Sequence, residues 1–265
     1  MARLTSYEGL TVLVTGASSG IGRQLALRVA AAGARVGLVA RRELELEKLA
    51  EDIGAVGGKA VTLVCDIGDR EQALATAERA VDALGPIDVL VNNAGYGHHR
   101  RFLDWDLEDM ERVMRVNYLG TLYFTKALLP AMVERGRGWL VFIASAAGRI
   151  APADETAYAA SKHAMVGLAG ALSLEVEDAG VHVLTVCPGA IRTPFFDDEA
   201  IARLPAVARR QMAEPEDLVE AIIDALARGK RELTFPRWIA SGYVAQALAP
   251  SFFRGQLKKH TVKDD

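Results

Sequence analysis

The chain has 265 residues, of which 51% are hydrophobic and 25% charged, and its formal net charge at pH 7 is −3. This composition is typical of a globular enzyme with a large core, and the small negative charge gives no electrostatic reason to expect a nucleic-acid partner. No apolar run reaches the roughly 18 residues of a membrane-spanning helix, and the first residues contain no long apolar segment, so we expect neither a membrane span nor a secretory signal. The two cysteines, Cys65 and Cys187, lie in apolar runs, so we expect buried free thiols and a cytoplasmic protein.

Short apolar runs alternate with longer segments of helical periodicity along the chain. We predict strands at Leu10–Val14, Ala34–Val39, Val61–Cys65, Ile87–Val91, Trp139–Ala144, Val181–Val186 and Glu232–Phe235. We predict helices at Ile21–Ala32, Glu43–Ile53, Arg70–Leu84, Leu107–Arg135, Thr156–Asp178 and Pro215–Ala227. This alternation favours parallel βαβ units in one doubly wound sheet. We therefore expect a Rossmann-type α/β fold, with about seven mainly parallel strands and helices on both faces, as a single domain over residues 1–265.

The first predicted strand runs into the glycine-rich segment Thr15–Gly22, which leads into the first predicted helix. Glycines allow a sharp turn and a close approach of the backbone to a pyrophosphate, and the N–H groups at a helix start favour phosphate. The spacing G-x-x-x-G-x-G differs from the commoner G-x-G-x-x-G. We predict a dinucleotide-binding loop that contacts the cofactor through Gly16, Ser18, Ser19, Gly20 and Ile21.

The end of the second predicted strand bears on the choice between NAD and NADP. A carboxylate there would bind the ribose 2′-hydroxyl and repel a 2′-phosphate, but the strand ends in Arg41 and Arg42. Two guanidinium groups at this turn favour NADP(H), with Arg41 the better candidate. NAD(H) stays as the alternative, because either arginine can also be merely solvated.

Two other strand ends are expected to meet at the same crevice. Asp66 and Ile67 follow the third strand, where the carboxylate can accept a hydrogen bond from the adenine amino group and the isoleucine can pack beside the ring. Asn93, Ala94 and Gly95 follow the fourth strand, where small residues let the backbone lie against the cofactor. Each segment taken alone is an ordinary strand-end turn.

The catalytic prediction rests on Ser145, Tyr158 and Lys162. Ser145 ends the fifth predicted strand, and Tyr158 and Lys162 lie four apart near the start of the next helix, on one face. A free phenol titrates near pH 10, so acid–base work at neutral pH requires about 4 kcal/mol of stabilisation of its ionised form. A nearby ammonium and the positive nicotinamide of an oxidised cofactor act in that direction. Ser145 can then hold the carbonyl oxygen by a hydrogen bond.

Over nearly its whole length the chain resembles the short-chain dehydrogenase/reductase family. The matching motifs are Thr15–Gly22, Asn92–Gly95, Asn117, Ser145, Tyr158–Lys162, and Pro188-Gly189 with Thr193. The resemblance implies direct hydride transfer with Tyr158 protonating the oxygen, Lys162 binding the nicotinamide ribose, and Asn117 anchoring a water of a proton relay. It also implies cofactor contacts at Pro188, Gly189, Ile191 and Thr193.

We therefore expect an NADP(H)-dependent oxidoreductase that interconverts a carbonyl and an alcohol, with a non-catalytic NADP(H)-binding regulatory protein as the alternative. Besides Ser145 and Tyr158, the expected substrate residues are His98, Phe195 and Phe196, next to an apolar lid at about residues 196–212. The apolar content favours a lipophilic ketone or aldehyde, although these side chains can also pack on the domain. We predict no metal site, because no third ligand accompanies His98 and His99 at a suitable spacing.

The C-terminal extension, at about residues 238–265, is rich in aromatic and aliphatic residues and then turns basic. We favour a subunit contact or a cover for the pocket, and we keep peripheral membrane contact as the other interpretation. The family resemblance implies a homodimer or homotetramer.

Overall fold

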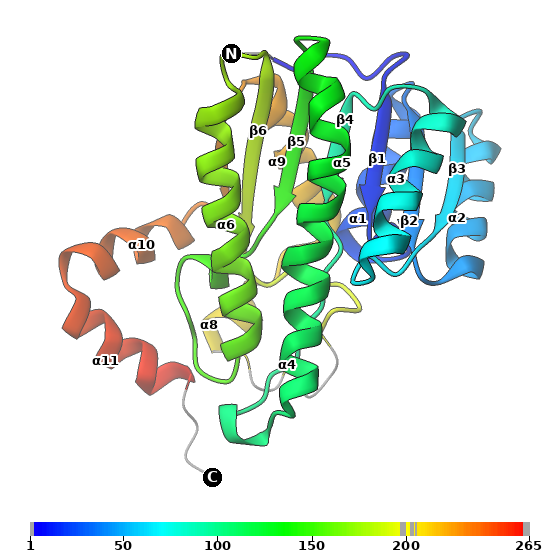
Figure 1. Ribbon diagram of the computed structural model, residues 1–265. Helices are drawn as coiled ribbons and strands as arrows, with labels where there is room; N and C mark the ends of the chain where they lie inside the picture. Colours follow the sequence, from blue (N-terminus) through cyan, green and yellow to red (C-terminus); the bar gives the residue numbers. More distant parts are fainter. Residues whose placement is uncertain (1–2, 197–199, 202–203, 205, 262–265) are drawn as a thin grey trace.

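The computed structural model describes residues 3–196, 200–201, 204 and 206–261. A seven-stranded sheet in the order β3-β2-β1-β4-β5-β6-β7 forms its centre (Figure 1), and every neighbouring pair is parallel. The strands are β1 (Thr11–Thr15), β2 (Arg35–Ala40), β3 (Lys59–Val64), β4 (Val89–Asn92), β5 (Gly138–Ile143), β6 (Val181–Pro188) and β7 (Glu232–Phe235). The predicted Rossmann-type sheet is confirmed, with most strand ends shifted by one or two residues.

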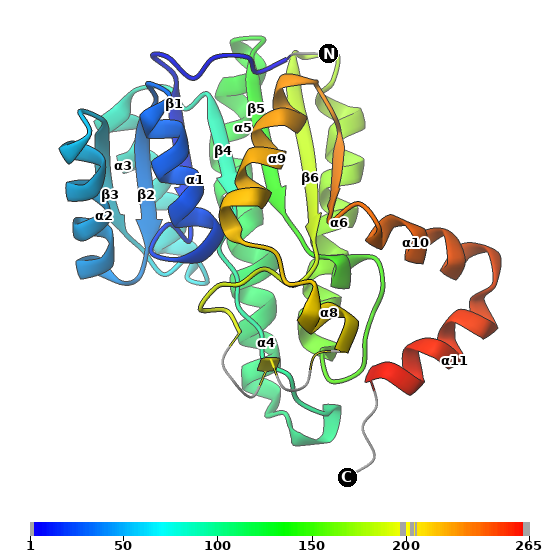
Figure 2. The ribbon, with the colours of Figure 1, turned by 180° about the vertical axis from the view of Figure 1, so that it is seen from behind.

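Helices cover both faces of this sheet. Figure 1 shows one face covered by α3 (Arg70–Leu84), α5 (Gly120–Glu134) and α6 (Thr156–Val176). Figure 2 shows the other face covered by α1 (Gly20–Ala31), α2 (Glu43–Ala55) and α9 (Pro215–Ala227). The sheet has a hydrophobic core on each face, and alternate residues of a strand pack into opposite cores. Val12 and Val14 pack towards α1, whereas Leu13 packs on the other face. This explains the continuous apolar runs that predicted the strands.

The long helix predicted at Leu107–Arg135 is interrupted in its middle. It consists of α4 (Leu107–Met114), a π-helical turn (Arg115–Leu119) and α5, so the backbone stays helical but is wider at Asn117. Such turns are rare and occur often at functional sites. The hydrophobic periodicity cannot reveal this turn, because one extra residue in a helix changes the pattern very little.

Two helices of the C-terminal extension were not predicted. They are α10 (Ile239–Leu248) and α11 (Pro250–Thr261), which project from the body beside the lower end of α6 in both views (Figures 1 and 2). The backbone N–H of Ala153 donates to the Thr261 hydroxyl over 3.4 Å, which ties the end of α11 to the loop before α6. No helix in the described part of the chain is long and apolar enough to cross a membrane.

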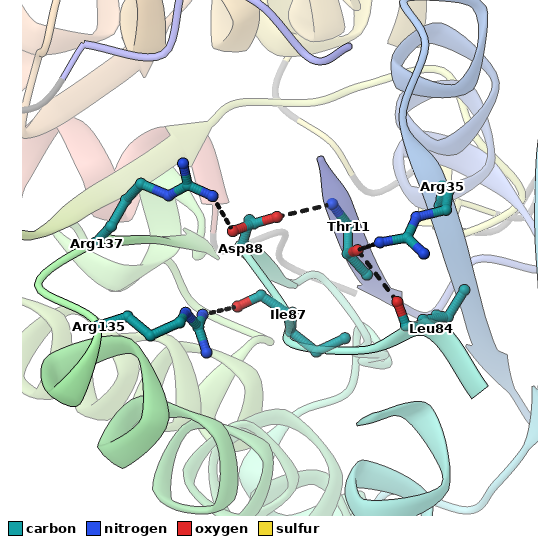
Figure 3. Close-up of polar contacts among 7 residues, drawn as sticks. All are labelled: Thr11, Arg35, Leu84, Ile87, Asp88, Arg135 and Arg137. Atoms are coloured by element: carbon teal, nitrogen blue, oxygen red, sulfur yellow. Dashed lines mark hydrogen bonds and ion pairs between the residues drawn. The ribbon is translucent and has the colours of Figure 1, made fainter. Parts of the chain in front are cut away.

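A polar cluster holds the amino ends of the central strands (Figure 3). Asp88, which is 7% exposed, accepts a hydrogen bond of 3.0 Å from the Thr11 backbone N–H and one of 2.8 Å from Arg137. Arg35 donates to the Thr11 hydroxyl over 2.9 Å. Asp88 therefore satisfies a buried backbone donor at the first residue of β1.

We expect Asp88→Ala to lower the free energy of unfolding by about 1–3 kcal/mol, because the Thr11 N–H stays buried without its acceptor. Urea denaturation measures the change, and cofactor binding is retained because Asp88 lies at the other end of the sheet from the glycine-rich segment. The control is Asp224→Ala, whose exposed i,i+4 pair with Arg228 is worth about 0.5 kcal/mol or less. Equal losses in the two variants would contradict the role of Asp88.

Candidate active site

One large cavity, of about 1290 Å³, lies beyond the carboxyl ends of the strands, where a doubly wound sheet binds its ligands. Nearly all the predicted site residues line it: Gly16, Ser18, Ser19, Gly20, Ile21, Arg41, Arg42, Asp66, Ile67, Asn93, Ala94, Gly95, His98, Ser145, Tyr158, Lys162, Pro188, Gly189, Ile191, Thr193, Phe195 and Phe196. Asn117 is the exception, because it is fully buried behind the wall. Of the predicted lid, residues 197–199, 202–203 and 205 lie outside the described part, as do 262–265 of the C-terminal extension.

The glycine-rich segment turns tightly at the start of α1. Gly16 has a φ of +68°, and a Cβ atom there would stand 2.7 Å from the Ala94 Cα. A Cβ atom on Gly20 would stand 3.1 Å from Thr193, so the loops after β1 and β6 approach each other here. The N-cap residue Ser19 makes no side-chain capping bond, which leaves the first N–H groups of α1 for an anion. The segment therefore fits a pyrophosphate.

A brace between β1 and β4 holds this turn. The Thr15 hydroxyl accepts from the backbone N–H groups of Asn93 and Ala94 over 3.0 and 3.1 Å and donates to the Val91 carbonyl over 3.2 Å. The Asn93 amide donates to the carbonyls of Thr15 and Gly16 over 2.9 and 3.2 Å. The side chain of Asn93 therefore shapes the loop, a role that its place in the motif did not reveal.

The two arginines after β2 have different surroundings. The Arg42 guanidinium donates to the hydroxyls of Ser18 and Ser19 over 2.9 and 2.7 Å, which brings its charge to the glycine-rich turn. Arg41 is exposed and lines the same cavity, and its charge helps to lower the pKa of Asp66. A positive region therefore borders the cavity where the second strand ends, and Arg42 is as well placed as Arg41.

Asp66 has a partner that the sequence did not suggest. Its carboxylate forms an ion pair with Arg112 of α4 and accepts from the Gly68 N–H over 3.0 Å. Burial acts to raise the pKa of Asp66, but the hydrogen bonds from Arg112 and Gly68 outweigh it, so the pKa lies below its usual range. Asp66 is therefore a carboxylate at neutral pH, an acceptor as expected, although Arg112 already engages one of its oxygens.

The loop after β6 is held in place by its neighbours. The Gly189 N–H donates to the Phe235 carbonyl over 2.7 Å. Ile191, which is 2% exposed, pairs with Ala213 in a short parallel bridge. These backbone contacts present Gly189 and Thr193 to the cavity beside the glycine-rich turn.

Ser145, Tyr158 and Lys162 converge on the cavity from β5 and α6. The Ser145 hydroxyl accepts from the Ala147 N–H over 3.0 Å, and its hydrogen bonding to the Tyr158 phenol acts to lower the pKa of that phenol. Lys162 is 3% exposed, its Nζ donates to the Ile143 carbonyl over 2.8 Å, and it lies 5.7 Å from the centroid of the Tyr158 ring. The predicted triad is thus brought together in space.

The pKa of Tyr158 is not lowered by Lys162 in the way that we expected. Burial raises it above the ordinary phenol value, the Ser145 hydrogen bond lowers it, and the charge of Glu155 raises it further. Burial also lowers the pKa of Lys162 to about 8. Lys162 therefore does not lower the pKa of Tyr158 as we expected. Loss of solvation has the largest effect on the pKa of both side chains.

Asn117 lies in the π turn with its side chain fully engaged. Its Oδ1 accepts from the Tyr96 N–H over 3.0 Å, and its Nδ2 donates to the Tyr96 carbonyl and to the Ser161 hydroxyl over 2.9 and 3.0 Å. A Cβ atom on Gly95 would stand 3.2 Å from Asn117 Oδ1 and 3.4 Å from Lys162 Nζ. Asn117 and Lys162 therefore face the same glycine, and the π turn supports the segment that follows β4.

The far side of the cavity is aromatic. The ring centroids of Tyr158 and Phe195 are 5.4 Å apart, those of Phe195 and Phe196 are 5.0 Å apart, and those of Phe196 and His99 are 5.9 Å apart. His98 is exposed at the rim and packs near Trp105. Phe195 and Phe196 thus stand where the prediction put them, and His99 is the more enclosed of the two histidines.

Sequence reasoning missed several cavity residues. Glu155, whose side chain is 15% exposed, lines the cavity three positions before Tyr158, and its carboxylate lies 3.2 Å from His99 Nδ1. Its place three residues before Tyr158 in the sequence was a usable signal. The C-terminal extension, for which a pocket cover was one of the expectations, does contribute lining residues: Trp238, Ile239, Gly242, Phe253, Leu257 and Thr261. Within the described part of the chain, no group of three or more His, Cys, Asp or Glu residues could hold a metal ion.

Comparison with known proteins agrees with this geometry. The family model described as short chain dehydrogenase matches residues 10–203. The chain belongs to the short-chain dehydrogenase/reductase family. It is 33% identical over 230 residues to the ketoacyl reductase HetN of Nostoc sp., covering 87% of this chain and 79% of that one. It is 41% identical over 204 residues to the oxidoreductase UcpA of Salmonella typhimurium, covering 77% and 75%.

Solved structures of short-chain dehydrogenases/reductases show the same fold. One from Mycobacterium marinum has a TM-score of 0.78 and 32% identity, covering 87% of this chain and 95% of that one. A variant of actinorhodin polyketide ketoreductase, solved with NADPH, has a TM-score of 0.77 and 31% identity, covering 88% and 97%. The chain is therefore an oxidoreductase of a family that uses NAD(P)(H).

We expect Glu155→Gln to flatten the dependence of stability on pH. Burial raises the pKa of Glu155 from 4.5 to about 7, and the charge of Asp154 adds to the effect. Between these values the folded protein binds more protons than the unfolded chain, so the free energy of unfolding falls as pH rises, by up to about 1.4 kcal/mol per pH unit. Urea denaturation between these pH values measures the slope.

The matched control is Glu216→Gln, an exposed acid in the first turn of α9, which should keep the wild-type slope. An unchanged slope in Glu155→Gln would contradict the burial of a titrating carboxyl in the cavity.

Proposed function

We propose that the protein is an NADP(H)-dependent reductase of a ketone or an aldehyde, which also runs in reverse on the alcohol. The observation that carries the proposal is the convergence of Ser145, Tyr158 and Lys162 on one cavity, which the glycine-rich turn and Arg42 also border. Positioned acid and hydrogen-bond donors beside a dinucleotide site are what carbonyl reduction requires. Two relatives with ketoreductase names support the same chemistry.

The residues at the carboxyl ends of the strands fit a dinucleotide. The uncapped start of α1 suits the pyrophosphate, the Arg41 and Arg42 pair suits a 2′-phosphate, and Asp66 can accept from an adenine amino group. Pro188, Gly189, Ile191 and Thr193 would lie along the nicotinamide. When bound, NADPH supplies the hydride that the carbonyl carbon receives.

The chain's own residues would handle the substrate oxygen and its proton. Ser145 would hold the oxygen by a hydrogen bond, and Tyr158 would donate its phenolic proton to it. The phenolate formed would be stabilised by the Ser145 hydroxyl and by the ammonium of Lys162. Asn117, through its position beside Lys162, would support the return of a proton from solvent.

We further propose that the substrate is lipophilic, because Phe195 packs on Tyr158, Phe196 packs on Phe195, and the C-terminal helices add apolar lining residues. The segment at about 196–212 would act as a lid and the extension from residue 238 as a pocket cover, within one domain. A homodimer or homotetramer, a cytoplasmic location and the less favoured peripheral membrane contact stay predictions.

We expect Tyr158→Phe to bind NADPH within about twofold of the wild type and to lose about 10²–10⁴-fold in kcat, because the proton donor is gone. The assay follows NADPH absorbance over a panel of aldehydes, steroids, diketones, 3-oxoacyl thioesters and sugars. The control Tyr123→Phe, on α5 and outside the cavity, keeps wild-type turnover. Unchanged kcat in Tyr158→Phe would remove this residue from the mechanism, and tight NADPH binding without turnover of any substrate would favour the regulatory alternative.

We expect the double variant Arg41→Ala with Arg42→Ala to lower the ratio of kcat/KM for NADPH to that for NADH by about tenfold or more. Each charged hydrogen bond to a phosphate contributes about 1.5–3 kcal/mol. Steady-state kinetics with both cofactors measures the ratio, and Arg228→Ala, an exposed arginine at the end of α9, serves as the control. A higher efficiency of the wild type with NADH would overturn the NADP(H) proposal.

A further inference from the structure

An acidic side chain stands at the end of the cavity's aromatic wall. The rings of Tyr158, Phe195, Phe196 and His99 follow one another at centroid distances of 5.4, 5.0 and 5.9 Å, and Glu155 contacts His99. The wall is therefore apolar between two polar ends. One end carries the reacting phenol and the other carries a carboxylate.

The carboxylate of Glu155 is enclosed but incompletely paired. Its Oε1 lies 3.2 Å from His99 Nδ1, and the side chains of His99 and Glu155 are 10% and 15% exposed. No described residue donates a hydrogen bond to the second carboxylate oxygen, although a carboxylate can accept about four. Burying such a group with few partners is costly, and burial accordingly raises the pKa of Glu155 to about 7.

The backbone holds Glu155 in this place at some conformational cost. Asp154, the residue before it, has a φ of +62°, and among the described non-glycine residues it alone has a positive φ. The Arg100 N–H donates to the Asp154 carbonyl over 2.8 Å, which joins this turn to the segment that carries His99. Backbone outliers of this kind concentrate at functional sites, where the surrounding structure maintains them.

Glu155 stands immediately before α6, on the same cavity as Tyr158. It is the N-cap residue of α6 and precedes Tyr158 by three positions, and both residues line the cavity. A substrate whose carbonyl meets Tyr158 and whose chain follows Phe195 and Phe196 would therefore bring its other end to Glu155.

We propose that Glu155, oriented by His99, binds a hydrogen-bond donor of the substrate, a hydroxyl or a protonated amine, at a position remote from the reacting carbonyl. This inference rests on the proposed reduction of a ketone or aldehyde at Tyr158. The substrate is then a ketone or aldehyde with two polar groups separated by an apolar stretch that packs on Phe195 and Phe196. Glu155 is a specificity-determining residue, because it selects the substrate without taking part in the proton transfer.

The test is a binding comparison on the whole protein saturated with NADP⁺. Straight-chain methyl ketones of increasing length are prepared with three different ends: hydroxyl, primary amine or methyl. Isothermal titration calorimetry gives the Kd of each. One chain length should reach from Tyr158 to Glu155. At that length, we expect the ligand ending in a hydroxyl or an amine to bind about tenfold more tightly than the ligand of the same length ending in a methyl group, because a hydrogen bond to a charged group contributes about this much.

Variants of Glu155 test whether this residue causes the tighter binding of the hydroxyl or amine ligand. Glu155→Leu should reduce the preference to about one, Glu155→Gln should keep part of it because the amide oxygen still accepts, and Glu216→Gln should keep all of it. The Kd of the methyl ligand and of NADP⁺ confirm that each variant is folded, and His99→Phe gives a second measurement if Glu155→Leu does not fold. Equal affinities for all three ends, or an unchanged preference in Glu155→Leu, would overturn the inference.

Turnover of the same ligands separates this inference from the proposed function. If the methyl ketones are reduced but ligands with and without a terminal hydrogen-bond donor bind equally well, the reductase proposal holds and the role of Glu155 is wrong. A binding preference that Glu155→Leu abolishes, without reduction of any ligand, would support the donor site and count against the reductase.

Discussion

Burial of the parallel sheet on both faces is the constraint on which the rest of this protein depends. Strands such as β1 and β5 are buried along their whole length, so their side chains are mostly apolar and polar groups gather where the strands end. Because all neighbouring strands are parallel, their carboxyl ends meet at one edge. The glycine-rich turn, Ser145 and the loop after β6 are therefore brought together by the same burial that stabilises the fold.

Burial also acts on the ionisable groups that we propose to be catalytic. Desolvation raises the pKa of Tyr158 and lowers that of Lys162 to about 8, so both side chains are held towards their neutral forms. A neutral phenol suits a proton donor, and the Ser145 hydrogen bond favours the ionised product of that donation. The positive charge of an oxidised nicotinamide would act in the same direction as Ser145. In the proposed mechanism, the positive charge of the bound cofactor would therefore help to stabilise the Tyr158 phenolate.

The substrate side of the cavity is built from parts that are distant in the sequence. The segment after β4 supplies His99, the start of α6 supplies Glu155, and the loop after β6 supplies Phe195 and Phe196. The α11 helix returns to the same region, where Thr261 accepts from the Ala153 N–H. Loops and a C-terminal extension thus shape the part of the cavity that a substrate would enter, while the strand ends carry the groups that we propose for cofactor binding and proton transfer.

The sequence by itself determined the strand–helix order, the glycine-rich turn, and the set of Ser145, Tyr158 and Lys162, because periodicity and local spacing carry this information. Only the tertiary structure decided the partners of those residues. The pairing of Asp66 with Arg112, the brace from Thr15 to Asn93, the π turn at Asn117 and the contact of Glu155 with His99 all join segments or alter a helix in ways that no local pattern records. Such contacts depend on how the elements pack, and packing is a property of the whole chain.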